Sequence, residues 1–291
     1  MDTVELAAGE ARLSVVPSMG AGIADLSLTG ADGRSRPVLR PWSGRIEDGP
    51  FALACNLLVP FSNRIEGGFS FGGARHDLEP NLAGEPFAIH GDGFQRRWAV
   101  AERSRTATTL VLEDGAFGPL RYRAEITYAL SADALLATLT MTSAAEAPLP
   151  FGLGFHPWFP RSAGTRLLFE ADEVWLEDDR HLPTEKVPVN ERGDWAFSAG
   201  AALPDGLINN AFAGWRGPAH VTQASEAVPC TVTASDNLDV AIVYSPGAEA
   251  DFFCFEPVSH PVDAHNMDGL PGLAVLAPGE DLSGWMKIAW G

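Results

Sequence analysis

Two ionisable side chains stand in strongly apolar surroundings, and their types suit the transfer of a proton. Glu256 directly follows the run Phe252–Phe255, and His156 directly follows Phe151–Phe155. Apolar, aromatic runs of this kind are typical of buried strands, so we expect each strand to carry one of these side chains at its end. Burial removes solvation from a carboxylate or an imidazole and tunes its pKa, as a general acid or base requires.

Three other segments contain residues of the types that bind hydroxyl groups. Arg64 follows Asn63, and its planar guanidinium can donate to sugar hydroxyls or to a carboxylate. His90 precedes a glycine, which lets the backbone approach a ligand closely. Asn209 offers both a donor and acceptors. Each of these residues also fits an ordinary turn, so they indicate a site only if the segments converge.

The chain next to the candidate acid and base also bears on the site. Pro157 biases His156 toward extended geometry, and Trp158 beside it is suited to form a pocket wall. The stretch Pro257–Asn266 is too polar for a core segment, and we expect it to form a loop over the site.

Several classes of chemistry lack the motifs that they need. His260 and His265 do not have the spacing of an H-E-x-x-H zinc motif, and the sequence has no tight His/Cys cluster, so we expect no catalytic metal. A Walker loop and a G-x-G-x-x-G motif are both absent from the sequence, so a nucleotide cofactor is not indicated. The sequence therefore predicts an activity without cofactors.

Composition and charge restrict the partners. Hydrophobic residues make up 46% of the 291 residues, enough for a sizeable core. A net charge of −18 argues against nucleic acid and membrane partners and fits a small uncharged ligand, although acidity also simply aids solubility. Cys55, Cys230 and Cys254 form no motif, and the N-terminus has no signal-peptide pattern. We therefore expect a cytoplasmic protein without disulfides.

Strand patterns outnumber helix patterns along the whole chain. The segment Leu120–Leu130 alternates apolar and polar residues, and Ala134–Thr142 follows it after a turn as a partner strand. Asp114-Gly115 is expected to end a strand around Thr108–Leu112. Gly72-Gly73 follows two alternating phenylalanines and predicts a hairpin.

The same patterns continue to the end of the chain. Leu273–Leu276 and Trp285–Trp290 flank a Pro-Gly turn and are interpreted as strand, turn and strand. Many glycines and prolines spread along the sequence suit short strands joined by turns. We predict an all-β fold with little helix, a large antiparallel β-sandwich, as one domain over residues 1–291. Two β domains with a break at Ala144–Pro148 are the alternative.

Taken together, these segments resemble the aldose 1-epimerase family, also called galactose mutarotases. The shared motifs, in the family's order, are Asn63-Arg64-Ile65 with Gly67, His90-Gly91, His156-Pro157-Trp158-Phe159, Glu256-Pro257, Pro261–Asn266 and Leu276–Glu280. Each motif is weak alone, but several in order over most of the chain are fairly specific. The resemblance implies the galactose mutarotase-like supersandwich, which is a large antiparallel β-sandwich.

The resemblance also implies a reaction, the interconversion of the α and β anomers of a free aldose. Glu256 would be the general base that takes the proton of the anomeric hydroxyl. His156 would be the general acid that protonates the ring oxygen. The implied substrate-binding residues are Arg64, His90, Asn209, Asn63 and Trp158.

The chain departs from the family's pattern at two of these positions. Many members have an Asp at the position of Asn209, so a neutral amide here replaces a charge and leaves the substrate preference open. Trp158 stands where a Tyr is common. We expect Glu256 and His156 on opposite sides of the sugar ring, with Glu256 ionised and His156 protonated at rest, because each charge favours the other.

Three other functions stay open at this point. A mutarotase for a hexose 6-phosphate would need basic residues at the pocket rim, and Arg75, Arg96 and Arg97 are the candidates. A non-catalytic carbohydrate-binding protein would use its many aromatic residues to stack on sugar faces. A metal-dependent hydrolase is the third. For the predicted mutarotase we expect a small-molecule sugar as the partner, bound by a monomer or a homodimer.

Overall fold

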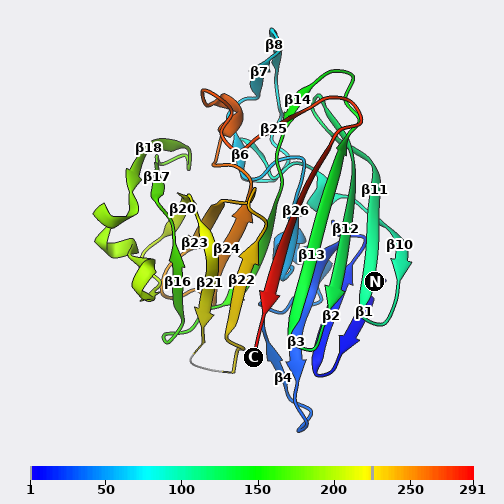
Figure 1. Ribbon diagram of the computed structural model, residues 1–291, viewed down its shortest axis with the longest axis vertical. Coiled ribbons are helices and arrows are strands. Elements are labelled where there is room, and N and C mark those ends of the chain that lie inside the picture. The colour runs from blue at the N-terminus through cyan, green and yellow to red at the C-terminus, as the bar shows by residue number, and fades with distance from the viewer. Residues whose placement is uncertain (1, 224–225) are drawn as a thin grey trace.

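The computed structural model describes residues 2–223 and 226–291, which form two large antiparallel sheets around an apolar core (Figure 1). The predicted all-β sandwich is confirmed. Helix in the described ranges is limited to single 3-10 turns: η1 (Ile46–Asp48), η2 (Pro50–Ala52), η3 (Gly93–Gln95), η4 (Val189–Glu191), η5 (Gly193–Trp195), η6 (Phe197–Ala199) and η7 (Ala264–Asn266). None of these turns has the length or the apolar character that crossing a bilayer demands.

The two sheets differ in size and in the part of the chain that they use. Among the described residues the larger sheet has eleven strands, in the spatial order β1 (Val4–Ala8), β2 (Ala11–Val16), β3 (Gly22–Thr29), β5 (Cys55–Leu58), β15 (Gly154–Pro160), β24 (Phe252–Val258), β23 (Val240–Ser245), β20 (Ile208–Ala213), β17 (Glu173–Glu177) and β18 (Pro183–Pro188), with β4 (Ser35–Pro37) beside β3. The smaller sheet has nine, in the order β10 (Ala99–Arg103), β11 (Ala107–Phe117), β12 (Leu120–Leu130), β13 (Ala134–Ser143), β26 (Asp281–Ala289), β22 (Cys230–Ala234), β21 (Arg216–Thr222), β16 (Arg166–Glu170) and β19 (Ala201–Ala202). Short two-stranded ladders join β14 (Leu149–Phe151) to β25 (Ala274–Leu276), β6 (Arg64–Ile65) to β9 (Ala88–Ile89), and β7 (Phe69–Phe71) to β8 (Ala74–His76).

The strand β12 has the predicted bounds, and its apolar face is buried as expected. The six alternating residues all point into the core: Leu120, Tyr122, Ala124, Ile126, Tyr128 and Leu130. The two tyrosines also need partners for their hydroxyl groups. Tyr128 donates to the carbonyl oxygen of Ala21 at 2.9 Å, and Tyr122 donates to Asp92 at 2.6 Å. These bonds link the smaller sheet to the segments before β3 and around η3.

The predicted end of the strand near Asp114 is wrong. β11 continues to Phe117, and its register with β12 shifts between Leu112 and Gly115. A bulge absorbs the extra residues where a turn was expected. A Cβ atom on Gly115 would lie only 2.4 Å from the ring of Tyr122, so the glycine is needed for packing against the ring rather than for a turn.

The hairpin at Gly72-Gly73 is confirmed as β7–β8. Both glycines have positive φ angles, 60° and 82°, as a two-residue hairpin turn of type I′ requires. The letters of Gly68–Gly72 also fit the G-x-S-x-G pattern of serine hydrolases. That motif requires a strand-turn-helix elbow, whereas Ser70 is exposed in a hairpin, so the segment is no nucleophile elbow.

The two predicted C-terminal strands exist, but they do not pair with each other. β25 pairs with β14, whereas β26 lies between β13 and β22 in the smaller sheet (Figure 1). Alternate residues of β26 point inward, and Met286 and Ile288 are buried in the core. The apolar face of β26 therefore decides its place in the sheet.

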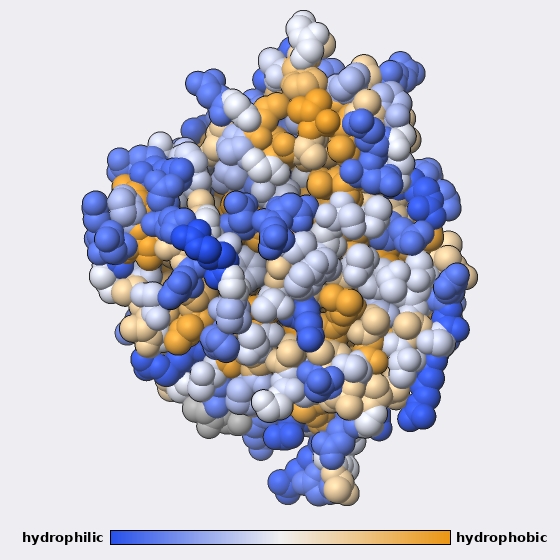
Figure 2. Space-filling model, in the orientation of Figure 1, coloured by the Kyte–Doolittle hydropathy of each residue, from blue (hydrophilic) through white to orange (hydrophobic). Residues whose placement is uncertain are grey.

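One hydrophobic cluster contains residues from Val4 to Trp290 and from both large sheets. The β13–β26 ladder also joins the chain before and after Ala144–Pro148, where a domain break was the alternative. The organisation as one domain stays a prediction that this continuity supports. On the face shown in Figure 2, apolar residues gather mainly at the end that bears β7, β14 and β25, with hydrophilic residues along the edges.

Two glycines, Gly91 and Gly72, have similar left-handed φ angles but different surroundings, so replacing each by alanine distinguishes the cost of a steric clash from the cost of backbone strain. Gly91 (φ 67°) would place a Cβ atom 2.2 Å from the carbonyl oxygen of Val59, whereas Gly72 (φ 60°) has open space around it. We expect Gly72→Ala to lower the free energy of unfolding by about 1–2 kcal/mol, the cost of a left-handed alanine. Gly91→Ala adds a clash with backbone worth roughly 1–3 kcal/mol more. Urea unfolding of both variants measures the difference, and equal losses would contradict this interpretation.

Candidate active site

The pairing register of β15 with β24 places the candidate acid directly beside the candidate base. Trp158 lies opposite Cys254, so that two residues further along the ladder His156 faces Glu256. Nε2 of His156 and Oε1 of Glu256 are 3.4 Å apart. The expectation that both residues stand at strand ends is wrong. Both lie inside their strands, because β15 and β24 each continue past them through a proline.

Neighbouring strands extend this pair into a floor with two rows of side chains. Tyr244 in β23 pairs with Cys254, and Asn209 in β20 pairs with Tyr244. Side chains along a strand alternate between the two faces of a sheet, so every second residue points the same way. Trp158, Cys254, Tyr244 and Asn209 therefore form one row, and the acid–base pair belongs to the next.

An irregular segment around β6 and β9 forms the wall above this floor. Asn63 and His90 both have left-handed backbone, with φ angles of 55° and 58°. The N–H of Asn63 donates to Nδ1 of His90 at 2.9 Å, and the N–H of His90 donates to the carbonyl oxygen of Asn63 at 2.9 Å. Because Nδ1 accepts, the neutral imidazole carries its proton on Nε2. His90 thus offers a fixed N–H donor.

A single side chain, Asn81, holds the backbone on both sides of His90. Its Nδ2 donates to the carbonyl oxygens of Ile89 and Gly91 at 2.9 and 2.7 Å. Its Oδ1 accepts from the N–H of Ile89 at 2.8 Å. Strained backbone persists only where its surroundings fix it, and these three bonds fix the loop that carries His90.

Floor and wall enclose a cavity of about 420 Å³, within the usual size of small-molecule sites. Every residue chosen from the sequence lines it: Asn63, Arg64, His90, His156, Trp158, Asn209 and Glu256. The other lining residues were not foreseen: Phe51, Leu82, Glu85, Ile89, His181, Leu207 and Tyr244. Tyr244 ends the continuous apolar run 240–244, which is typical of a buried strand, whereas Glu85 and His181 lie in loops without a motif.

The positive charge of Arg64 is matched inside the cavity. Its Nε and Nη2 donate to the two carboxylate oxygens of Glu85, both at 2.9 Å. Its Nη1 also contacts Oδ1 of Asn63 at 3.3 Å. A forked contact of this kind fixes the guanidinium in one orientation, so Arg64 is both neutralised and held in place.

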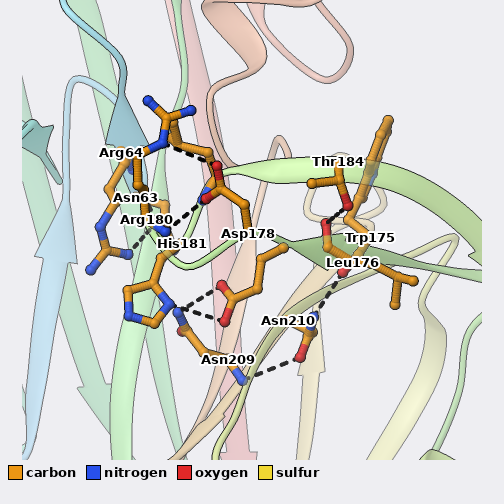
Figure 3. A network of polar contacts seen from close by, with 12 residues as sticks. Asn63, Arg64, Trp175, Leu176, Asp178, Arg180, His181, Thr184, Asn209 and Asn210 are labelled. Carbon is orange, nitrogen blue, oxygen red and sulfur yellow. Dashed lines mark hydrogen bonds and ion pairs between the residues drawn. The ribbon is translucent and has the colours of Figure 1, made fainter.

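Asn209 and His181, which Figure 3 shows close together, both contact Glu177 at one side of the cavity. Nδ2 of Asn209 donates to Oε2 of Glu177 at 3.1 Å, and Nδ1 of His181 lies 3.0 Å from Oε1. Burial raises the pKa of Glu177, and the hydrogen bonds from its neighbours act in the opposite direction. The side chain of Asn210 points away from the cavity and donates to the carbonyl oxygen of Trp175 at 2.9 Å.

Arg180 joins the β17–β18 hairpin to the segment after β6. Its guanidinium contacts Asp178 at 3.1 Å within the hairpin and also pairs with Glu66 across the gap (Figure 3). Glu66 is in turn held by Asp263, which accepts its N–H at 2.9 Å. The hairpin that carries His181 is therefore tied to the segment that carries Arg64.

The expected charges of the acid–base pair at rest are wrong. Burial lowers the pKa of His156 to about 3 and raises the pKa of Glu256 well above its ordinary value, although Arg64 opposes the second shift. The 3.4 Å contact is an ion pair only if the shared proton sits on the imidazole. Because desolvation is the largest influence on both pKa values, we assign the neutral pair to the resting protein.

Three buried polar atoms at the site have no hydrogen-bond partner in the described part of the chain. They are Nδ1 of His156, Oε2 of Glu256 and Nε1 of Trp158. Buried polar atoms are normally paired, because an unpaired one costs about 1–3 kcal/mol. All three belong to residues that line the cavity.

Trp158 also holds the imidazole of His156 in place. The two rings stack with centroids 4.8 Å apart and an angle of 16°. The guanidinium of Arg40 lies 4.2 Å from the centroid of Trp158 and donates to the carbonyl oxygen of Phe51 at 2.7 Å. Arg40 thereby connects two aromatic residues that line the cavity, a role that no motif indicated.

The expectation of a polar loop over the site is wrong for Pro257–His265. This stretch is buried throughout, and none of its residues lines the cavity. His260 accepts the N–H of Ser62 at 3.0 Å, and His265 donates to the carbonyl oxygen of Pro150 at 3.1 Å. These histidines satisfy backbone groups, which explains how polar residues can lie in the core.

Comparison with known proteins agrees with these observations. Residues 2–289 match the family model described as aldose 1-epimerase. An uncharacterized protein of Escherichia coli (strain K12), YphB, is 34% identical over 262 residues, which are 87% of this chain and 88% of that protein. Both matches extend over most of the chain.

Solved structures extend the comparison to the fold. A crystal structure from Escherichia coli K12, provisionally named as an aldose 1-epimerase, has a TM-score of 0.89 and 31% identity and covers 100% of this chain and 99% of its own. A galactose mutarotase-like protein from Clostridium acetobutylicum has a TM-score of 0.84 with 21% identity, over 98% of this chain and 93% of its own. The second likeness shows the fold alone.

The buried histidines make the fold sensitive to acid. Burial lowers the pKa of His156 and His265 to about 3, that of His260 to about 4, and that of His90 well below 6.5. Below pH 6.5 the unfolded chain binds protons that the folded chain refuses, so stability falls as the pH falls. The raised pKa of Glu256 acts in the opposite direction. We expect the free energy of unfolding to be about 3 kcal/mol lower at pH 5.5 than at pH 7, measured with urea.

A variant of one histidine serves as the control for this pH dependence. His265→Gln keeps a donor for the carbonyl oxygen of Pro150 but does not titrate. The variant should lose about 1 kcal/mol less than the parent between pH 7 and pH 5.5. An unchanged pH dependence in His265→Gln would contradict the assignment of neutral buried histidines.

Proposed function

The chain belongs to the aldose 1-epimerase family, and we propose that it interconverts the α and β anomers of a free aldose by acid–base opening and closing of the sugar ring. The observation that carries this proposal is the 3.4 Å contact between Nε2 of His156 and Oε1 of Glu256 beside a cavity of monosaccharide-binding character. The reaction moves protons and no electrons, so side chains of these two types are sufficient for its chemistry.

The geometry of the pair fits the positions of the reacting oxygens. The anomeric hydroxyl and the ring oxygen are both bonded to C1, so the base for one and the acid for the other must lie side by side. The contact between His156 and Glu256 meets this requirement. It replaces our expectation that the two groups face each other across the ring.

The pair can complete the reaction without a change in its total charge. In the proposal, Glu256 takes the proton of the anomeric hydroxyl while His156 gives one to the ring oxygen, and the ring opens to the aldehyde. Rotation about the C1–C2 bond and the reverse transfers close the other anomer. A net charge created in a buried site costs several kcal/mol, and this sequence creates none.

Substrate binding supplies the hydrogen bonds that would stabilise the carboxylate and the imidazolium of the ionic form. At rest both groups are neutral, because burial opposes charge. Sugar hydroxyls that donate to Oε2 of Glu256 stabilise its carboxylate, and those that accept from Nδ1 of His156 stabilise its imidazolium. The sugar thereby shifts the shared proton toward the form in which Glu256 is the base.

The remaining lining residues are suited to hold the sugar in place. His90 offers its Nε2–H, and the fixed guanidinium of Arg64 offers N–H groups beside it. Asn63 belongs to the same wall. Because Nδ2 of Asn209 is engaged by Glu177, its carbonyl oxygen is the group that can accept from a hydroxyl. Trp158 offers its indole N–H.

The charges around the cavity favour a neutral sugar over a sugar phosphate. Of the described residues that line the cavity, Arg64 is the one arginine, and Glu85 neutralises it. The candidates for a phosphate-binding rim do not line the cavity: Arg75 pairs with Asp77, Arg96 pairs with Asp92 and Asp114, and Arg97 lies outside the lining. A dianionic phosphate would find no free cation there.

Replacement of Glu256 by Gln tests the proposed base. Glu256→Gln keeps the shape of the side chain but cannot take a proton, so we expect the rate of anomer exchange to fall by about 10²–10⁴. NMR exchange spectroscopy of α and β sugar signals measures it. Tyr244→Phe, a change in the same floor at a residue without a proton role, should alter the rate only a few-fold.

The outcome also separates an enzyme from a sugar-binding protein. Titration followed by NMR should show that Glu256→Gln still binds the sugar. A wild-type protein that binds sugars without accelerating exchange would be a binding protein, and the proposed function would be wrong. Exchange that survives in Glu256→Gln would remove this residue from the role of base.

A panel of sugars tests the preference for a neutral substrate. Glucose, galactose, arabinose and xylose, freshly dissolved as single anomers, should be converted by the wild-type protein. Hexose 6-phosphates should be converted with a kcat/KM at least about tenfold lower, because the phosphate lacks a cationic partner. Polarimetry with enzyme-free controls for the spontaneous rate measures both groups. A preference for a phosphate would contradict the interpretation of the cavity's charges.

A further inference from the structure

Cys254 is a buried thiol in the floor of the site that the proposed reaction does not use. It is fully buried, and in the ladder it stands between Trp158 and Tyr244. One ligand atom each from Cys254, His156 and Glu256 lie within 4.8 Å of one another. Sulfur, imidazole nitrogen and carboxylate oxygen are the ligand types of protein zinc sites.

The spacing of these atoms is close to that of a coordination shell. Ligands of a tetrahedral zinc ion with bonds of about 2.0–2.3 Å lie about 3.3–3.8 Å apart. The contact between His156 and Glu256, at 3.4 Å, already has this spacing. The largest separation in the group has to shrink by about 1–1.5 Å to match that shell, which is a side-chain adjustment rather than a change of backbone.

A second, independent observation points to a ligand at this place. Nδ1 of His156 and Oε2 of Glu256 are buried and without hydrogen-bond partners in the described part of the chain. The two residues are only 6% and 2% exposed. Neither side chain is therefore held by a competing hydrogen bond through these atoms, and a cation on the other two, Nε2 and Oε1, would replace only their mutual 3.4 Å contact.

The charge balance selects the kind of cation. One thiolate, one carboxylate and one neutral imidazole bring two negative charges, so a divalent ion gives a complex without net charge in a buried site. On binding, the thiol proton and any proton on the carboxyl group leave to solvent. Mg²⁺ and Ca²⁺ prefer six or more oxygen ligands and do not fit this set.

We propose that a thiophilic divalent cation, with Zn²⁺ as the probe, binds to Cys254, His156 and Glu256 and inhibits the enzyme. The ion occupies both groups that transfer protons, so bound sugar cannot be opened. Metal binding itself does not depend on the proposed function, whereas the inhibition rests on it. The two parts are therefore tested separately.

Cobalt reports on the binding without any sugar. Co²⁺ added to the wild-type protein should give a near-ultraviolet thiolate-to-cobalt charge-transfer band, and Zn²⁺ should abolish it by displacement. The band should be absent from Cys254→Ala and present in Cys230→Ala, which removes a buried thiol in β22 of the other sheet. A wild-type protein without the band, or a Cys254→Ala variant that keeps it, would overturn the proposal.

The effect on catalysis is measured as inhibition of anomer exchange. Zn²⁺ should inhibit the wild-type protein and Cys230→Ala alike, a chelator should restore the rate, and Mg²⁺ should have no effect. Because Cys254 belongs to the floor of the site, inhibition of Cys254→Ala is measured relative to its own rate without metal. Its sensitivity to Zn²⁺ should fall by more than the about 10–100-fold that loss of an outer-shell partner brings.

Each failure has its own meaning in this design. Equal sensitivity of Cys254→Ala and the wild-type protein would overturn the assigned ligands. A cobalt band in a protein that never exchanges anomers would refute the proposed function and leave the metal site intact. Exchange that resists Zn²⁺ while the cobalt band is displaced would refute inhibition at this site.

Discussion

The register of β15 against β24 is the constraint on which the rest of the site depends. A shift of one residue would turn either His156 or Glu256 to the opposite face of the sheet, and a shift of two would part them along the strand. β5 and β23 flank the two strands on either side, so a shift would have to break these ladders as well. The position of two atoms at 3.4 Å is thus secured by the centre of an eleven-stranded sheet.

Burial gives the site its chemistry, and it imposes a restriction on charge. Burial lowers the pKa values of His90 and His260, and as neutral imidazoles they accept hydrogen bonds from the backbone N–H groups of Asn63 and Ser62. The positive charge of Arg64, the arginine that lines the cavity among the described residues, is balanced by the carboxylate of Glu85. A reaction that moves protons between neighbouring groups suits such a place, because the net charge of the pair stays constant throughout.

Much of the fold and the chemistry could be predicted from local patterns. The alternation of Leu120–Leu130 reports which face is buried, and it gave the bounds of β12. Motifs identified seven of the fourteen described residues that line the cavity, although each motif alone also fits an ordinary structural role. The resemblance to a family indicated that these motifs belong to one site, and the structure places their side chains around one cavity.

What escaped prediction depends on contacts between distant segments. The bulge at Gly115 exists because the ring of Tyr122 fills the space of a side chain, and nothing local announces it. Pro257–His265 was predicted to be too polar for the core. It is buried because hydrogen-bond partners in distant segments satisfy its polar groups, and the local sequence does not reveal those partners. The protonation of His156 and Glu256 follows from the depth of their burial, which no single segment reveals.

The place of β26 between β13 and β22 has a consequence during synthesis. Thr140 and Ser283 face each other across the β13–β26 ladder, yet they are 143 residues apart in the chain. At about 5–20 residues per second, a ribosome needs roughly 7–30 s to make that stretch. For this period the nascent β13 presents an open edge that can recruit strands from other polypeptides. Chaperones that shield such edges during translation should therefore matter more for the yield of this protein than for a chain whose sheets close locally.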